Sequence, residues 1–229
     1  LSGCVDLSQH LNDLHLGDEI FDLSSQYPDL KLVDLRNSDF PLHQPTANLK
    51  IFCRNEEFDQ RMYELFRQEL HHLSILDSPF VIRLLGFTRY PILSILTEDV
   101  PQTLFSVLSD SEASEWTEMT DILIAFHLSK AVAHMHRKNV FHLDINPKNV
   151  FLQETNNKKR FRAKIGSFHR SSSSKTTRKQ TSDPKFCPPE LIAIENGGSP
   201  VDSSACDVYC LGLLFYCLAK RNPTPGWKN

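Results

Sequence analysis

Glycine is scarce in this sequence, and its placement excludes one common way of binding a phosphate. The chain of 229 residues has eight glycines, and none lies between Gly17 and Gly86. Glycine-rich turns let backbone amides approach a ligand closely because glycine has no side chain. A G-x-G-x-x-G turn is therefore excluded from that part of the chain.

Long apolar runs and a strong net charge are also lacking. The apolar stretch from Val208 to Ala219 has 12 residues, whereas a helix needs about 20 to cross a bilayer, so we predict a core helix and no membrane span. The net charge of −3 does not indicate nucleic acid as a partner. No basic and then apolar leader follows Leu1, so we expect the sequence to be an excerpt that lacks any targeting signal.

The six cysteines show no metal-binding spacing. Cys206, Cys210 and Cys217 lie at helical spacings in an apolar run, without a CxxC pair or a nearby histidine to support zinc. We expect packing in a core in preference to metal ligation. This use of cysteine fits a reducing, intracellular location, for which we expect the cytoplasm.

The composition that remains is that of a globular protein. Apolar residues make up 40% and charged residues 23%, which suffices for one large domain or two modest lobes. The change from sheet-like to helical patterns near Pro101 predicts a boundary between two lobes. Strands are expected at 30–35, 47–52, 81–87, 92–96 and 162–168, and helices at 56–76, 104–108, around 124–135 and at 208–219.

The predicted helix from Glu56 to Leu76 carries an acid among its apolar positions. Its stripe consists of Met62, Leu65, Leu73 and Leu76. Glu69 lies four residues from both Leu65 and Leu73. A buried carboxylate needs a partner or a shifted pKa. The alternative is a glutamate at the edge of the stripe that reaches water.

A segment rich in hydroxyl groups follows the last predicted strand. Eight of the twelve residues from Ser171 to Ser182 are Ser or Thr, and basic residues are mixed among them. This composition predicts a mobile, solvated loop. We expect it to be accessible to phosphorylation by another enzyme.

The stretch from Val140 to Leu152 combines polar side chains with strand-like ends. Its sequence is VFHLDINPKNVFL, and its polar residues are His142, Asp144, Asn146, Lys148 and Asn149. A polar loop between buried anchors is suited to presenting functional groups. An ordinary turn at Asn146-Pro147 is the alternative.

In order along the chain, these features resemble the protein kinase family. The stretch is similar to the catalytic loop H-R-D-x-x-x-x-N, with Asp144 at the base and Asn149 at a metal-ligand position. Pro188-Pro189-Glu190 resembles A-P-E, and Asp207-Val-Tyr-Cys-Leu-Gly212 resembles D-V-W-S-L-G.

The resemblance implies an α+β, two-lobed fold. Residues 1–98 would form an N-lobe with an antiparallel sheet and helix C, 99–101 a hinge, and 102–229 a mainly helical C-lobe truncated at its end. Lys50 matches the strand-3 lysine and Glu69 the helix-C glutamate that pairs with it. Thr97 and Glu98 match the gatekeeper and hinge, which completes the expected nucleotide-binding set.

The departures from the family pattern concern catalysis. The metal-binding aspartate of D-F-G is replaced by Ser167, and a hydroxyl is a poor ligand for magnesium. Leu143 replaces the H-R-D arginine, and Asn146 the catalytic-loop lysine, for which Lys148 would be a partial substitute. We therefore expect Asp144 to be an idle base.

The sequence thus predicts a pseudokinase with weak or no ATP binding, without magnesium, that acts through other proteins such as a kinase or signalling effector. One alternative is an atypical active Ser/Thr kinase in which Asn149 and an unrecognised carboxylate hold the metal. Another is an interaction module independent of nucleotide, in which Lys50 and Glu69 are merely structural.

Overall fold

The structure, a computed structural model, describes most of the chain in separate stretches. These stretches are 5–6, 29–34, 46–54, 59–89, 92–110, 116–155, 161–178, 181–194 and 199–226. Contacts divide the chain into an N-terminal unit, Leu1–Asp77 with Ile82–Asp99, and a C-terminal unit, Ser78–Val81 with Val100–Asn229. Each unit is described by itself.

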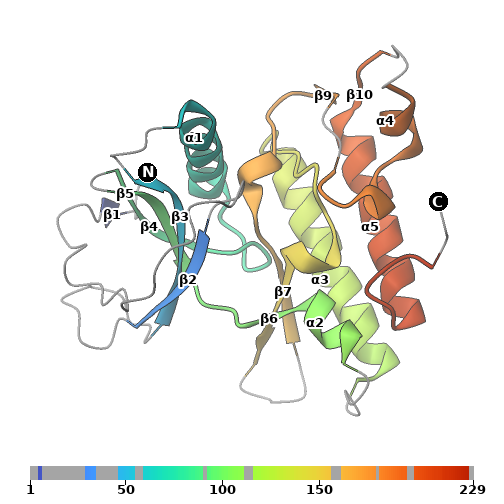
Figure 1. The fold of residues 1–229 in the computed structure, drawn as a ribbon. Coiled ribbons are helices and arrows are strands. Elements are labelled where there is room, and N and C mark those ends of the chain that lie inside the picture. Colours follow the sequence, from blue (N-terminus) through green and yellow to red (C-terminus); the bar gives the residue numbers. More distant parts are fainter. Residues whose placement is uncertain are drawn as a thin grey trace. The chain divides into compact units, whose positions relative to one another are not determined.

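The N-terminal unit is built on a five-stranded sheet with the order β1-β4-β5-β3-β2 (Figure 1). The strands are β1 (Val5–Asp6), β2 (Asp29–Asp34), β3 (Thr46–Arg54), β4 (Leu84–Thr88) and β5 (Ile92–Glu98). All neighbours pair antiparallel except β1 and β4. The expected strands are confirmed, but Val81, Ile82 and Arg83 lie outside β4.

One helix, α1 (Gln60–Ile75), contacts strands β3, β4 and β5. The Asp59 side chain accepts a hydrogen bond from the Arg61 amide and so caps the first turn. The buried face of α1 differs from the predicted stripe, because Met62 and Leu65 are only half-buried. Its buried members are Phe66, Glu69, Leu70, His72 and Leu73. Residues 56–58 of the predicted helix lie outside the described part.

The C-terminal unit is mainly helical, which confirms the α+β fold class. Its helices are α2 (Leu104–Ser109), α3 (Glu118–Arg137), α4 (Pro189–Ala193) and α5 (Ser203–Lys220). Its strands are β6 (Gln102–Thr103), β7 (Val150–Glu154), β8 (Phe161–Ile165), β9 (Thr176–Thr177) and β10 (Val201–Asp202). The order β6-β7-β8 forms one sheet, which α3 contacts through β8, and β9 pairs with β10.

The segment Ser78–Val81 joins the C-terminal unit, although the sequence analysis placed it in the first lobe. The amide of Ile165 donates to the Phe80 carbonyl at 2.9 Å, and Val81 forms a bridge with Ile165. The Phe80 ring stacks on His127 with centroids 4.7 Å apart. These contacts account for the difference, because they bind the segment to β8 and α3.

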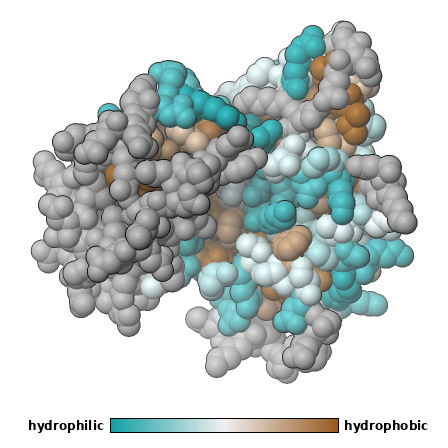
Figure 2. Space-filling model, in the orientation of Figure 1, coloured by the Kyte–Doolittle hydropathy of each residue, from teal (hydrophilic) through white to brown (hydrophobic). Residues whose placement is uncertain are grey.

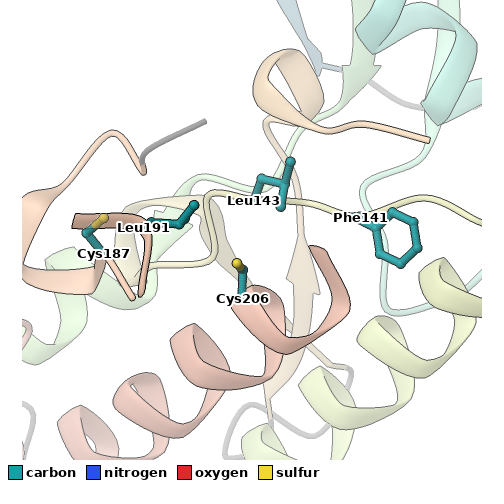
Figure 3. Packing of buried hydrophobic residues seen from close by; sticks show 5 residues of the cluster. All are labelled: Phe141, Leu143, Cys187, Leu191 and Cys206. Atoms are coloured by element: carbon teal, nitrogen blue, oxygen red, sulfur yellow. The ribbon is translucent and has the colours of Figure 1, made fainter. Parts of the chain in front are cut away.

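A core of buried side chains connects the Val140–Leu152 stretch to α4 and α5. Figure 3 shows Phe141 and Leu143 on that stretch, with Cys206 on α5 pointing toward it and Cys187 and Leu191 near α4. Burial raises the pKa of Cys206 to about 12, so it is a neutral thiol at neutral pH. The predicted core role of Cys206, Cys210 and Cys217 is confirmed by their burial.

The hydroxyl-rich segment is more ordered than predicted. Strand β9 lies within it, and Phe141 and Ser172 exchange backbone hydrogen bonds of 2.8 Å. Ser171, Thr177 and Thr181 are buried. The expectation of a solvated loop is wrong for these positions, whereas Ser173, Ser174 and Thr176 are exposed.

Within the described residues, no helix combines the length and the apolar character that crossing a membrane requires. The visible face of the C-terminal unit is mainly hydrophilic, with hydrophobic residues in small patches (Figure 2). Helix α5 is confirmed as the predicted core helix, but one of its faces is not covered. Val208 is 58% exposed and Tyr216 is 38% exposed.

His127 makes the C-terminal unit sensitive to acid. Its Nδ1 accepts a hydrogen bond of 3.3 Å from the Ala163 amide, which requires the neutral ring. Burial, and next the charge of Arg162, lower the pKa of His127. The unfolded chain therefore binds this proton more readily than the folded chain. The stabilisation is complete above the unfolded pKa of about 6.5 and decreases as the pH falls through the lowered folded value.

We expect His127→Gln to reduce the loss of stability between neutral and mildly acidic pH, because glutamine can accept the Ala163 hydrogen bond without titrating. Urea unfolding across this pH range measures the effect. Parallel curves for His127→Gln and the unsubstituted chain would contradict the assignment.

Candidate functional site

The predicted site residues form two groups, one in each unit. In the N-terminal unit, β3 supplies Lys50 and α1 supplies Glu69. The Lys50 ammonium lies 2.7 Å from Glu69 Oε2, and only 15% and 4% of the two side chains are exposed. Lys50 also lies over the Phe52 ring, 5.4 Å from its centroid. The predicted partner of Glu69 is therefore present, and Glu69 is not a stripe-edge residue open to water.

Thr97 and Glu98 lie at the end of β5. The Glu98 carboxylate is buried and accepts a hydrogen bond of 2.8 Å from the Arg83 amide. The Glu98 amide in turn donates to the Arg83 carbonyl at 3.0 Å. Through these two hydrogen bonds, Glu98 attaches Arg83, which precedes β4, to the end of β5. Thr97, the preceding residue, is half-buried.

In the C-terminal unit, Asp144 is the centre of a hydrogen-bond network and is almost fully buried. Ser182 donates to its carboxylate through both the amide, at 2.8 Å, and the hydroxyl, at 2.7 Å. The Asn149 amide group donates to Asp144 Oδ2 at 2.9 Å and to its backbone carbonyl at 2.8 Å. The carboxylate that would act as a base is thus satisfied from within the chain.

The buried His142 side chain makes hydrogen bonds that stabilise this loop. Its Nδ1 accepts a hydrogen bond from the Asp144 amide at 3.3 Å, so the proton is assigned to Nε2, which lies 2.8 Å from the Gly166 carbonyl. The Phe168 ring lies edge-on to the His142 imidazole, with the two ring centroids 4.9 Å apart. His142 therefore connects the loop to the Gly166–Phe168 turn without facing solvent.

Asn146 and Lys148, both predicted as catalytic, have local contacts. The Asn146 side chain accepts from the Lys148 amide at 3.0 Å and donates to the Asp144 carbonyl at 3.0 Å. It caps the turn Pro147–Asn149. The Lys148 ammonium lies over the Phe105 ring of α2 at 5.3 Å. The structure therefore gives both residues a role in shaping the turn.

Ser167 lies at the position where the resemblance to D-F-G implies a metal-binding aspartate, and its backbone is left-handed with φ of 68°. Asn149 and Ser167 together offer one carboxamide oxygen and one hydroxyl. Magnesium prefers carboxylates and substrate phosphates, so these residues do not fit it. No group of three His, Cys, Asp or Glu residues that could hold a metal is found among the residues that the structure describes.

Asp207, on α5, holds the loop in place and is fully buried. Its two carboxylate oxygens accept hydrogen bonds from the amides of His142, at 2.8 Å, and Leu143, at 2.7 Å. His136 Nε2 lies 2.9 Å from Oδ2. Leu143 is held in the left-handed region at φ of 60°, a conformation that costs an L-residue roughly 1–2 kcal/mol.

Sequence reasoning missed three of these contributors. Asp207 belongs to the motif that resembles D-V-W-S-L-G, which does not reveal its contacts, and no local pattern marks His136 or Ser182 as part of the site. Asp207 lies 71 residues from His136, and Ser182 lies 38 residues from Asp144. Ser182 has no local signal, because it is one of many hydroxyl residues in its segment.

The comparisons with known proteins agree with this geometry. The profile of the protein kinase domain matches residues 44–228, which is most of the chain. The chain therefore belongs to the protein kinase domain family.

Several curated kinases are similar at modest identity. An Aurora kinase of Yarrowia lipolytica is 29% identical over 187 residues, covering 78% of this chain and 47% of that protein. The probable serine/threonine-protein kinase zyg-1 of Caenorhabditis elegans is 32% identical over 112 residues, 47% of this chain and 15% of the relative. An Aurora kinase of Patiria pectinifera is 28% identical over 173 residues, covering 73% of this chain and 40% of that protein. The chain spans less than half the length of these relatives.

The Lys50–Glu69 pair gives a prediction for stability. Lys50→Met should lower the free energy of unfolding by about 3 kcal/mol, because it removes the ammonium that lies 2.7 Å from the buried Glu69 carboxylate. Glu69→Gln should have a similar effect, and the double variant should lose little more. Urea unfolding measures all three.

A matched control for this pair lies on the same helix. Arg67 and Glu64 are 3.0 Å apart, with 68% and 50% of their side chains exposed. Arg67→Met should therefore cost less than about 1 kcal/mol. Equal, small losses for Lys50→Met and Arg67→Met would show that the pair contributes no more than a surface ion pair.

The hydrogen bonds that Asp207 accepts from the His142 and Leu143 amides, here called the Asp207 clamp, give a second prediction. Asp207→Asn should destabilise the chain by about 3 kcal/mol, because an amide group cannot accept both backbone hydrogen bonds and presents N–H donors instead. Asp202, the exposed N-cap of α5, is the control, since asparagine caps a helix about as well as aspartate. An Asp207→Asn variant as stable as Asp202→Asn would refute the clamp.

Proposed function

We propose that this protein kinase domain is a pseudokinase that regulates or scaffolds through contacts with other proteins. The observation that carries the proposal is Ser167, a hydroxyl in place of the metal-binding carboxylate. Protein kinase domains in general use ATP and magnesium, and catalysis of phosphoryl transfer is almost entirely positioning and charge stabilisation. Without the carboxylate, the phosphates would have no positioned metal.

The hydrogen bonds of Asp144 support the same proposal. An incoming hydroxyl would have to displace Ser182 from the carboxylate, to which Ser182 donates at 2.7 Å. A base is effective only when its substrate is placed beside it. The absence of glycine between Gly17 and Gly86 removes the turn that would hold the phosphates. We infer weak ATP binding at most, without dependence on magnesium.

The N-terminal unit supports regulation by conformation. The Lys50–Glu69 pair is formed and largely buried although the metal position is lost. We propose that the paired state holds α1 inward, that the unpaired state releases it, and that a partner distinguishes the two. The partner would be a protein, such as another kinase or a signalling effector, in the cytoplasm.

The second candidate is an atypical active Ser/Thr kinase. Asp144 and Asn149 are retained, the Lys50–Glu69 pair is formed, and a relative is named a serine/threonine-protein kinase. This function would need a further carboxylate to hold the metal. Lys50 would then bind phosphate, and Asp144 would accept the proton of the substrate hydroxyl.

A nucleotide titration tests the proposal, with thermal unfolding as the readout. We expect ATP to give a small rise in the melting temperature that is the same with and without magnesium. For scale, a ligand at 100 times its dissociation constant stabilises a fold by about 2.7 kcal/mol. Ser167→Asp should make the rise depend on magnesium, because it restores the carboxylate in a backbone conformation that aspartate tolerates.

Turnover of radiolabelled ATP gives the decisive comparison. We expect none above background, with Asp144→Asn as the blank. Phosphoryl transfer by the unsubstituted chain that Asp144→Asn abolishes would overturn the pseudokinase proposal and establish the second candidate. A large, magnesium-dependent shift without Ser167→Asp would also favour that candidate.

A further inference from the structure

Ser182 is the residue at which the hydroxyl-rich segment meets the buried Asp144 carboxylate. Its hydroxyl oxygen lies 2.7 Å from Oδ1 and 2.8 Å from Oδ2, and its amide donates to Oδ1 at 2.8 Å. Asp144 is only 1% exposed, whereas Ser182 is exposed. The contact therefore joins a buried charge to a hydroxyl group at the surface of the C-terminal unit.

Among the described residues of the hydroxyl-rich segment, only Ser182 donates to Asp144. Three of the other hydroxyl residues are buried in the folded chain, namely Ser171, Thr177 and Thr181. Ser174 is exposed, but its hydroxyl donates to the Thr176 carbonyl at 2.8 Å, which is a contact within the segment. A change at Ser182 therefore has a consequence for the catalytic-loop region that a change at Ser174 lacks.

The surroundings of Asp144 do not offset a second negative charge. In the described part of the chain, its carboxylate accepts hydrogen bonds from Ser182 and from the Asn149 carboxamide, and no ion pair joins it to a basic side chain. The Lys148 ammonium lies over the Phe105 ring, 5.3 Å from the centroid. A phosphate on serine carries a charge of about −1.5 to −2 at neutral pH. Phosphorylation of Ser182 would thus replace a hydrogen bond with repulsion between two anions.

The chain is anchored on both sides of Ser182, so a release at this residue is a local event. Upstream, Thr177 belongs to β9, which pairs with β10. Downstream, Phe186 is 1% exposed, and its carbonyl accepts a hydrogen bond from the Cys210 thiol at 3.2 Å. Between these anchors, the hydrogen bonds from Ser182 to Asp144 are the contact that a phosphate would break.

Two basic residues precede Ser182 in the sequence. Arg178 and Lys179 lie four and three positions before it, and Arg178 is exposed. Positive charges in these places favour binding of the segment to a surface of opposite charge. A protein kinase with acidic residues in its substrate groove is therefore the class of enzyme that fits this segment.

We propose that Ser182 is a phosphorylation site, and that its phosphate releases residues 181–185 from the buried Asp144 carboxylate. In the reaction, the Ser182 oxygen forms a bond to the γ-phosphorus of ATP held by the other kinase, and the bond from that phosphorus to the oxygen bridging to the β-phosphate breaks. ADP leaves, and the hydroxyl proton passes to a base of that kinase. The inference does not depend on whether this domain itself transfers phosphate.

Hydrogen exchange of the amide of residue 182 measures the release, with phosphoserine placed at this position during translation. We expect its exchange to accelerate by about a hundredfold or more, because the repulsion between the two anions removes its acceptor. Ser182→Ala should accelerate it by only about tenfold, as expected for the loss of one hydrogen bond to a charged group. Phosphoserine at position 174 is the matched control, and it should leave this amide unchanged.

A substitution at the carboxylate separates charge repulsion from the bulk of the phosphate. Asp144→Asn, in the chain that carries phosphoserine at position 182, should restore most of the protection, because a carboxamide can donate a hydrogen bond to the phosphate. Asp144→Asn in the unphosphorylated chain provides the reference. Thermal unfolding of each protein verifies that it is folded.

Phosphopeptide mapping of the chain, purified from the cells that produce it, tests whether the site is used. We expect a phosphopeptide in which Ser182 carries the phosphate, and replacement of both Arg178 and Lys179 by alanine should remove most of it, because the attraction to an acidic groove is lost.

Three outcomes would overturn the proposal. Phosphate found at other residues of the segment, with Ser182 unmodified, would exclude the site. Equal exchange of the residue 182 amide with and without phosphate at Ser182 would exclude the release. An equal acceleration by phosphoserine at position 174 would show that the added charge loosens the segment without acting through Asp144.

Discussion

The carboxylate of Asp207 is the constraint on which the catalytic-loop region depends. It is fully buried on α5 and receives two backbone amides, from His142 and Leu143, while the His136 ring lies against it. A buried carboxylate is costly unless its oxygens are satisfied, so the loop and the helix must meet in one arrangement. That arrangement holds Leu143 in a left-handed conformation which a leucine would otherwise avoid.

The hydrogen bonds to Asp207 position the rest of the loop. With Leu143 fixed, Asp144 lies where Ser182 and Asn149 reach its carboxylate, and His142 connects the loop to Gly166. The geometry of a kinase catalytic loop is thus maintained by contacts that do not depend on catalysis.

The two units retain different parts of the kinase pattern. The N-terminal unit keeps Lys50 and Glu69 in contact. Either charged side chain would be costly to bury without the other. The C-terminal unit joins Asp144 and Asn149 in one hydrogen-bond network and has Ser167 where the family resemblance implies an aspartate.

The hydroxyl-rich segment shows why composition alone is a weak guide to exposure. Its residues predict solvation, yet Ser171 is fully buried and Thr177 lies in a strand paired with β10. Backbone groups decide this outcome, since any sequence can form the hydrogen bonds of a strand pair. The partner strand lies beyond α4 in the chain, where local reasoning cannot find it.

Local pattern in the sequence was sufficient to determine most helices and strands and to single out the polar loop from His142 to Asn149. Periodicity located α1, α3 and α5, and the spacing from His142 to Asn149 identified the loop, because both signals lie within a few turns of chain. The resemblance to the kinase family predicted Lys50 as the partner of Glu69, whereas only the tertiary structure determined Ser182 as the partner of Asp144 and two backbone amides as the partners of Asp207. These partners are 19, 38 and about 65 residues apart, and contacts at such separations are set by the packing of whole elements.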